Sequence, residues 1–326
     1  MASKVPLTIE RNTLNMNSIH DSEQKNQQKR VLSIQSHVVH GYVGNKSATF
    51  PLQVLGFDVD AINSVHFSNH TGYDHIRGQK LSNKELSDIF SGLQQNNLLG
   101  TYSHLLTGYI GVNSFLTEIA SIVKAIREAN PNIVYVCDPV LGDDGEMYVP
   151  ESLIPIYRNK ILPLADICTP NQFEAELLTG KPIQTKEDAW QAIEWFHEKG
   201  VKVVVLSSTT VGDASELIGF LSENNGTTKT RHTIKIPLIG NGIVFTGVGD
   251  LFAALFLAHS TTKPSLKEGL EYTIATLQAI LNNTVDHIKN VHRCSKPNSY
   301  QRELRLIQSK SDIENPIVSI RANIVE

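Results

Sequence analysis

Short apolar runs of β-type residues alternate with amphipathic helical stretches through most of the chain, and this alternation limits the possible folds more than any other feature. The run 133–137 is apolar at every position, which is expected of a parallel strand with both faces buried. Ahead of it, apolar residues recur at helical spacing from Phe115, and this helix must stop before Pro131. The other strands predicted in this half are 31–36, 57–63 and 104–108.

The second half of the chain continues the pattern. Asn225-Gly226 is a turn typical of hairpins, and Ser265 with Glu268 matches the S-x-x-E capping box. The predicted elements are a strand at 164–168, a helix ending at Gly180, a helix from Thr185 to Gly200 with Asp188 near its start, a strand at 201–206, a hairpin within 215–236, a helix at 251–258 and a long helix from Ser265. This order predicts βαβ units in an open, mostly parallel α/β sheet with helices on both faces and an antiparallel edge hairpin.

Composition excludes several classes of protein. Lysine and arginine number 29 against 33 aspartate and glutamate, a net charge of −4, so nothing favours a nucleic acid or a membrane surface as partner. No apolar run reaches the roughly 18 residues of a membrane helix. Residues 1–30 carry acids and lack an apolar stretch, so they are predicted to be a polar, disordered extension and not a signal or transit peptide. Residues 31–326 contain no linker or repeat and are predicted to form one domain.

Cysteine and histidine spacing gives no indication of a metal centre of those ligands. Cys137 and Cys168 lie in apolar runs and are predicted to be reduced core thiols, which together with Cys294 form no ligand spacing. This usage indicates a reducing compartment, the cytoplasm or the nucleus. The histidines expected to border a ligand pocket are His37, His66, His70 and His75.

Polar side chains follow several predicted strands, at the edge where an open α/β sheet binds its ligands. They are Asp138 and Asp143 after one strand, Thr169, Asn171 and Glu174 after another, and Ser207 and Ser208 at a third. Singly, Asp-Pro and Thr-Pro-Asn segments occur as ordinary turns and helix caps. Their convergence on one edge favours a site for hydrated Mg²⁺ and phosphates, because Mg²⁺ retains waters and takes only one or two carboxylates.

The most specific local signal is the glycine-rich turn at 246–252, which opens an apolar helix. Gly247 and Gly249 allow close approach of a ligand, and the free N–H groups of the first helical turn form an anion hole. Asp250 beside this hole suits a base that takes a hydroxyl proton during phosphoryl transfer. Such a turn is also a common helix start. A P-loop motif is absent, and Gly41 and Gly44 have the wrong spacing for a dinucleotide fingerprint.

Long ordered strings then identify a family resemblance. They are VLSIQSHV at 31–38, GYVGN at 41–45, FPLQVLGF at 50–57, NSVHFSNHTGY at 63–73, LTGY at 106–109, VCDPVLGD at 136–143, MYVP at 147–150, TPNQFEAELLTG at 169–180 and ELRLIQSKSDIENP at 303–316. In this order they resemble the pyridoxal kinases of the ribokinase-like superfamily, from about residue 31 to the end. The resemblance implies a ribokinase-like fold, a homodimer, and transfer of phosphate from ATP to the 5′-hydroxyl of pyridoxal, pyridoxine or pyridoxamine.

The same resemblance implies the roles of individual residues. For the vitamin, Ser36 and Thr71 would bond the pyridine ring, Val43 and Tyr109 would pack against it, and Tyr148 would belong to a flap over it. For the nucleotide, the implied residues are Asp138, Asn171, Ser207, Ser208, Asn241, Gly242, Gly247, Val248 and Gly249. For metals, Asp138, Asp143 and Glu174 would serve Mg²⁺ (or Zn²⁺) with ATP, while Thr169 and Ser207 would bind K⁺ or Na⁺. Asp250 would be the base, and the amides of Gly247, Val248 and Gly249 the anion hole.

One position departs from the family pattern. Pyridoxal kinases usually have threonine where Val248 stands, with its hydroxyl on phosphate, and loss of such a bond costs about 1.5–3 kcal/mol. We therefore expect a slower enzyme. Two other functions stay open. One is a hydroxymethylpyrimidine kinase of the same fold. The other, suggested by Val248, is a vitamin-binding or sensing protein with vestigial catalysis.

Overall fold

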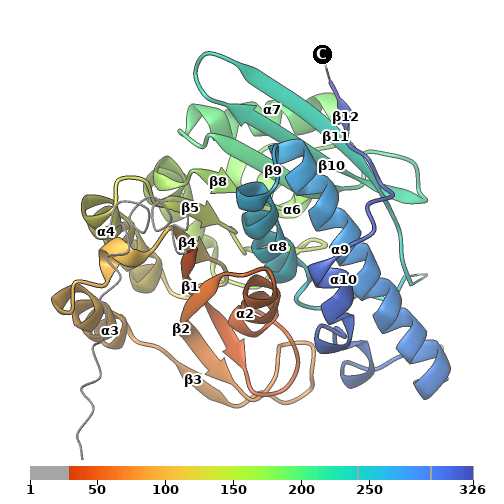
Figure 1. Cartoon of the computed structure of the whole chain (residues 1–326), viewed down its shortest axis with the longest axis horizontal. Helices are drawn as coiled ribbons and strands as arrows, with labels where there is room; N and C mark the ends of the chain where they lie inside the picture. Colours follow the sequence, from red (N-terminus) through yellow and green to blue (C-terminus); the bar gives the residue numbers. More distant parts are fainter. Residues whose placement is uncertain (1–28, 241, 294–295, 326) are drawn as a thin grey trace, which may run out of the picture.

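The computed structural model describes residues 29–240, 242–293 and 296–325, and within them a ten-stranded sheet forms the centre of the molecule (Figure 1). Its order is β12-β11-β10-β9-β8-β5-β4-β1-β2-β3. The strands are β1 (Arg30–Val38), β2 (Asp58–Phe67), β3 (Gly78–Lys80), β4 (His104–Thr107), β5 (Val134–Cys137), β8 (Ile167–Cys168), β9 (Val203–Thr209), β10 (Glu216–Asn224), β11 (Lys229–Pro237) and β12 (Asn323–Ile324). A separate small hairpin pairs β6 (Gly142–Asp143) with β7 (Glu146–Met147).

The helices lie on both faces of this sheet. They are α2 (Asn45–Val54), α3 (Asn83–Gln95), α4 (Asn113–Ala129), α5 (Ile154–Ile156), α6 (Gln172–Thr179), α7 (Lys186–Glu198), α8 (Val248–Thr262), α9 (Leu266–His287) and α10 (Lys310–Glu314). The predicted fold class, a mostly parallel sheet covered on both sides, is confirmed.

Sheet topology indicates where a ligand is expected to bind. The central strands from β2 through β1, β4, β5 and β8 to β9 run parallel, and β3, β10, β11 and β12 are antiparallel additions at the two edges. After β1 the chain crosses to β2 on one side, and later strands pair on the other side, beginning with β4. The order of strands therefore reverses between β1 and β4, and a crevice beyond their carboxyl ends is the usual ligand position in such sheets.

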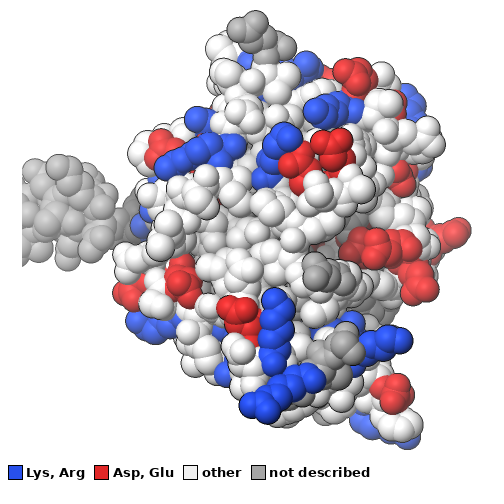
Figure 2. All heavy atoms as spheres, turned by 90° about the vertical axis from the view of Figure 1, so that its right-hand side faces the viewer, with Lys and Arg blue, Asp and Glu red and all other residues white. Residues whose placement is uncertain are grey.

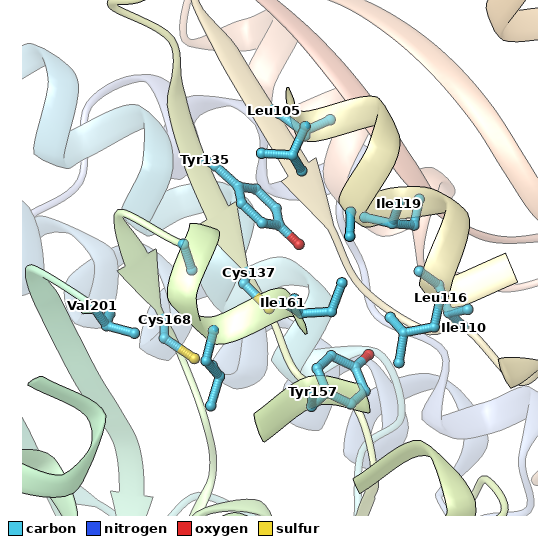
Figure 3. Close-up of a cluster of buried hydrophobic side chains, with 14 of the residues drawn as sticks. Leu105, Ile110, Leu116, Ile119, Tyr135, Cys137, Tyr157, Ile161, Cys168 and Val201 are labelled. Carbon is cyan, nitrogen blue, oxygen red and sulfur yellow. The ribbon is translucent and has the colours of Figure 1, made fainter. Parts of the chain in front are cut away.

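Two hydrophobic cores flank the sheet, because successive side chains of a strand point to opposite faces. Tyr135 and Cys137 of β5 enter the first core with α3, α4, α6 and α7, whereas Val136 enters the second core with α2, α8 and α9. Figure 3 shows part of the first core, with Tyr135 and Tyr157 near Cys137. Cys137 and Cys168 are buried free thiols, as predicted, whereas Cys294 lies outside the described residues.

Helix-end chemistry explains where the confirmed helices begin and stop. Thr185 and Asp188 form a complete capping box at the start of α7, and Gly180 in the left-handed region (φ 75°) ends α6. The Ser265 side chain accepts the N–H of Glu268 at the start of α9, as its motif predicts. The strand pair around Asn225-Gly226 is the expected antiparallel hairpin of β10 and β11.

Several predicted boundaries were wrong. The strand expected at 164–168 is only Ile167–Cys168, because the residues before it form a 3₁₀ turn at Leu162–Leu164. The helix expected to reach Gly200 ends at Glu198, and the following strand spans Val203–Thr209 instead of 201–206. The strand expected at 57–63 extends to Phe67, since β3 pairs with its last residues.

The charged side chains on the surface agree with the nearly balanced charge of the sequence. Figure 2 shows acidic and basic side chains of both signs on the face that carries α9. Within the described part of the chain, no helix combines the length and apolar character that crossing a bilayer requires.

Candidate active site

The parallel strands bring the predicted polar residues to one edge of the sheet. Ser36 lies near the end of β1, Asp138 directly follows β5, Thr169 follows β8, and Ser207 lies on β9. Ser36, Asp138 and Thr169 are buried, and Ser207 is half-buried. The N-terminus of α8 reaches this same edge, because Gly44 beside Ser36 bonds Asp250 and Gly249 faces Asp138.

The N-terminus of α8 is an uncapped helix end. Gly247 precedes it in the left-handed region (φ 82°), and none of the side chains that the structure describes caps the first turn. A Cβ at Gly247 would lie 2.1 Å from the carbonyl oxygen of Tyr42, so only glycine lets this turn pack on the loop after β1. The first amides of a helix have no intrahelical partner and carry the positive end of its dipole. This turn can therefore hold an anion.

Asp250 stands in the first turn of α8. Its Oδ2 accepts the N–H of Gly44 at 2.7 Å, and its side chain is partly exposed. Burial raises the pKa of Asp250, while the Gly44 hydrogen bond opposes the rise by favouring the carboxylate. A Cβ at Gly44 would lie 2.3 Å from Ser36 Oγ. Gly44 therefore lies between Ser36 on one side and Asp250 on the other.

Asp138 faces the α8 turn from β5. Its Oδ1 accepts the hydroxyl of Thr169 at 3.2 Å, while its buried Oδ2 has no hydrogen-bond partner in the structure. A Cβ at Gly249 would lie 4.0 Å from that free oxygen. Burial raises the pKa of Asp138 well above its ordinary value, and the negative charge of Asp250 adds to the rise. A buried acceptor without a donor is costly, which indicates a cationic or hydrogen-bonding ligand here.

Asn171 and Glu174 cap α6. The Asn171 side chain accepts the Glu174 N–H at 2.8 Å, and Glu174 Oε2 accepts the Asn171 N–H at 2.9 Å. Glu174 Oε1 accepts the N–H of Leu141 at 3.1 Å, and Asn171 Nδ2 donates to the Gly142 carbonyl. These residues thus perform the ordinary capping role and also attach the β6–β7 hairpin to α6. Burial, and next the charge of Asp138, raise the pKa of Glu174.

The β6–β7 hairpin carries two further predicted residues. Asp143 is exposed, and its Oδ1 accepts the N–H of Asp144 at 3.0 Å. Tyr148 follows the hairpin with 53% of its surface exposed, and its N–H donates to the Leu141 carbonyl. Burial of its ring and the charges of neighbouring acids raise the pKa of Tyr148 to about 12. Both side chains are therefore exposed, on a hairpin that hydrogen bonds attach to the start of α6.

The remaining predicted residues lie in or beside several different strands and loops. Val43 is buried, Tyr109 is half-buried after β4, and Thr71 is exposed in the loop after β2. Ser207 directs both its N–H and its hydroxyl to the Pro170 carbonyl. Ser208 is half-buried, Gly242 is exposed, and Asn241 lies outside the described residues.

The carboxylates fit a hydrated cation better than a metal held by protein ligands alone. Within the residues that the structure describes, no three His, Cys, Asp or Glu side chains form a group that could hold an ion. Both oxygens of Glu174 already accept N–H groups, whereas Asp138 Oδ2 is free. Mg²⁺ bound through one carboxylate, phosphates and waters matches such a site.

Comparison with known proteins identifies the family. The sequence profile of phosphomethylpyrimidine kinase matches residues 107–294. A pyridoxal kinase of Arabidopsis thaliana is 50% identical over 294 residues, covering 90% of this chain and 94% of the relative. One of Homo sapiens is 46% identical over 308 residues, covering 91% and 98%. The chain belongs to the pyridoxal kinase family. Among solved structures, the pyridoxal kinase from Leishmania donovani with ADP and pyridoxamine is similar, with TM-score 0.86, 37% identity and coverage of 91% and 100%.

Membership in the pyridoxal kinase family gives a context for Val248. Its side chain is half-buried and packs against the second core. The backbone amide of this position remains part of the α8 turn. Valine therefore alters one side chain of the turn and leaves the amides in place.

Two groups at this candidate site were not predicted from the sequence. The Gly44 amide bonds Asp250, and Glu303 bonds the neighbouring Tyr42 N–H at 3.0 Å. Gly44 stands in the quoted GYVGN string and Glu303 begins the C-terminal string, so both lay within recognised motifs. Nothing local in either motif indicates which distant residue it contacts.

Proposed function

We propose that this chain transfers the γ-phosphoryl group of ATP to the 5′-hydroxyl of pyridoxal, pyridoxine or pyridoxamine, and so serves vitamin B6 salvage. The observation that carries the proposal is a single arrangement: Asp250 lies in the uncapped first turn of α8, opposite the free oxygen of buried Asp138. A base and an anion hole side by side are what transfer to a hydroxyl requires. The named relatives, 50% and 46% identical, support the same reaction.

Asp250 acts as the base in this proposal. Its Oδ2 is held by the Gly44 N–H, which leaves Oδ1 for the 5′-hydroxyl. The carboxylate takes the hydroxyl proton as the hydroxyl oxygen forms a bond to the γ-phosphorus. The bond from that phosphorus to the β–γ bridging oxygen breaks, and ADP leaves with the electron pair. The amides of Gly247, Val248 and Gly249 steady the transferring phosphoryl group.

Cations complete the proposed nucleotide site. Asp138 would hold Mg²⁺ through its free oxygen, with Glu174 and Asp143 acting through water, and the ion would neutralise phosphate charge. These oxygen donors favour Mg²⁺ over Zn²⁺, which prefers nitrogen and sulfur ligands. The hydroxyls of Thr169 and Ser207 are the proposed ligands of K⁺ or Na⁺.

The remaining proposed contacts follow the strand ends. Ser36 and Thr71 would bond the pyridine, Val43 and Tyr109 would pack against it, and Tyr148 would cover it. The residues proposed to contact ATP are Asp138, Asn171, Ser207, Ser208, Asn241, Gly242, Gly247, Val248 and Gly249. We also propose that residues 31–326 work as one domain and form a homodimer in the cytoplasm or nucleus, which light scattering and cell fractionation would test.

A second candidate is favoured by the match of residues 107–294 to phosphomethylpyrimidine kinase. A coupled assay of ADP release with pyridoxal, pyridoxine, pyridoxamine and hydroxymethylpyrimidine at millimolar Mg-ATP with K⁺ separates the two. We expect the three vitamers to be phosphorylated faster than the pyrimidine. Preference for the pyrimidine would support the second function. Tight pyridoxal binding without turnover would support the vestigial binder instead.

A further inference from the structure

Glu303 connects two loops that carry proposed contacts with the vitamin. It begins the segment before α10, and its side chain is 13% exposed. Its Oε2 accepts the Tyr42 N–H at 3.0 Å, in the β1–α2 loop (residues 39–44). Its Oε1 accepts the Tyr73 hydroxyl at 2.9 Å and lies 3.1 Å from His70 Nε2, both in the β2–β3 loop (residues 68–77). One carboxylate thus holds both loops.

The surroundings of Glu303 are shaped for this carboxylate. Gly41 adopts φ 87°, and a Cβ there would lie 2.2 Å from Glu303 Oε1. His70 is buried, and its Nδ1 accepts the Gly72 N–H at 3.1 Å. Because Nδ1 is an acceptor, the ring proton lies on Nε2 and points at Glu303. Burial alone would raise the pKa of Glu303, but hydrogen bonds from His70 and Tyr73 hold it below the ordinary value, so the acceptor is ionised.

The two loops held in this way carry proposed substrate contacts. Thr71 lies between His70 and Gly72 in the β2–β3 loop, and Gly44 ends the β1–α2 loop with its N–H on Asp250. Ser299, just before this segment, also bonds the β2–β3 loop, because its hydroxyl donates to the Gly72 carbonyl. We propose that Glu303 is a positioning residue that fixes Thr71 and the β1–α2 loop for the vitamin. The inference rests on the proposed function.

The test compares Glu303→Gln with the wild type in steady-state kinetics and thermal unfolding. Glutamine keeps the size of the side chain but replaces one acceptor oxygen by an NH₂ donor. That donor would face either the Tyr42 N–H or the donors of His70 and Tyr73, so at least one hydrogen bond is lost. Loss of a bond to a charged group changes an equilibrium about 10- to 100-fold. We expect the KM for pyridoxal to rise about tenfold or more, with the KM for ATP within about twofold. Glu314→Gln, at an exposed glutamate of α10, is the matched control.

A second variant separates positioning from general damage. Tyr73→Phe removes one donor to Glu303 and should raise the KM for pyridoxal less than Glu303→Gln does. The effects of the two changes should be non-additive in the double variant, because they act on one network. Parallel rises in both KM values with a lowered Tm would assign Glu303 a merely structural role and overturn the inference, as would an unchanged KM for pyridoxal.

Direct binding distinguishes failure of this inference from failure of the proposed function. Equilibrium dialysis measures pyridoxal binding to the wild type and to Glu303→Gln without turnover. Weaker binding by the variant supports the positioning role even if no vitamer is phosphorylated. Equal affinity in the two proteins, or no pyridoxal binding by the wild type, overturns it.

Discussion

At the scale of single residues, the site brings the buried carboxylates of Asp138 and Glu174 close to the partly exposed carboxylate of Asp250. Burial raises the pKa of Asp138, Glu174 and Asp250. A neighbouring negative charge raises the pKa values of Asp138 and Glu174 further. Like charges at short range resist joint ionisation unless a cation or donors compensate. Among the described residues, nothing donates a hydrogen bond to Asp138 Oδ2 to provide such compensation. Ligand binding and ionisation of this cluster are therefore linked.

Asp250→Asn tests the base. Asparagine can still accept the Gly44 N–H through its carbonyl oxygen, but it cannot take a proton from the substrate. We expect kcat to fall about 100-fold or more, the usual contribution of a positioned base. Calorimetry should find Mg-ATP affinity within about twofold of the wild type. Asp286→Asn, at an exposed residue of α9, should behave as the wild type, and undiminished turnover in Asp250→Asn would refute its role.

Val248→Thr tests the residue that departs from the family pattern. A hydroxyl in the α8 turn can bond phosphate, so we expect kcat/KM to rise about tenfold. The exchange also replaces a methyl that packs at the edge of the second core, which should cost about 1 kcal/mol of the free energy of unfolding. Kinetics and denaturant unfolding measure the two effects. Unchanged or lower activity would show that the side chain at this position does not reach the phosphate.

At the scale of elements, the decisive unit is the junction between α8 and the loop after β1. Gly247 lies against the Tyr42 carbonyl, and the Ser47 hydroxyl donates to the Gly247 carbonyl at 3.1 Å. Asp250 and Gly44 form the next contact along the junction. The helix end is thus held by backbone approach on one side and by a carboxylate on the other. Its amides keep their orientation before any ligand binds.

Gly247→Ala, compared with Gly226→Ala, tests this junction. Both glycines have positive φ, 82° and 89°, but a Cβ at Gly247 meets Tyr42 at 2.1 Å while nothing lies within 4 Å of Gly226. The left-handed conformation costs alanine about 1–2 kcal/mol at either position. We expect Gly226→Ala to lower Tm slightly and keep full activity. Gly247→Ala should lower Tm further and lower kcat about 100-fold, because the amides move. Equal kinetics in the two variants would contradict this account.

At the scale of the whole molecule, α8 crosses the sheet from its carboxyl edge to its amino edge and is attached at both ends. Asp250 bonds Gly44 at the first end. At the other, Thr261 Oγ1 lies 3.0 Å from His104 Nε2, and the Nδ1 of this histidine lies 2.8 Å from Ser103 Oγ. His104 opens β4, the strand that follows the reversal of strand order. The position of the anion hole thus depends on contacts at both edges.

His104 makes stability depend on pH. Burial lowers its pKa from the ordinary 6.5 to about 4. Between pH 6.5 and 4, therefore, His104 takes up a proton in the unfolded chain but not in the folded chain. Over this range His104 lowers the free energy of unfolding by about 1.4 kcal/mol for each unit by which the pH falls. His104→Gln should be less stable at neutral pH but should lose less stability between pH 6.5 and 4. Thermal unfolding across this window measures the slope, and an unchanged slope would exclude His104 as its source.

Local pattern determined the elements whose signals lie within a few residues. Capping at Thr185, the hairpin at Asn225-Gly226 and the buried strand before Asp138 were all predictable, because periodicity and turn chemistry act between neighbours. The helix α2 was not predicted. It contains Pro51, and its buried residues Ala48 and Leu52 gain their stability from packing on the second core.

Sequence alone also placed Asp250 in a glycine-rich helix start, and parallel strands required the polar residues after them to share an edge. Only the tertiary structure decided which groups meet there. Glu303 and Tyr42 are 261 positions apart, and the Gly44 amide reaches Asp250 across 206 positions. Tertiary packing also left one oxygen of Asp138 without a donor and engaged both oxygens of Glu174. The packing of the whole chain determines which distant residues meet, and the local periodicity of the sequence does not predict these contacts.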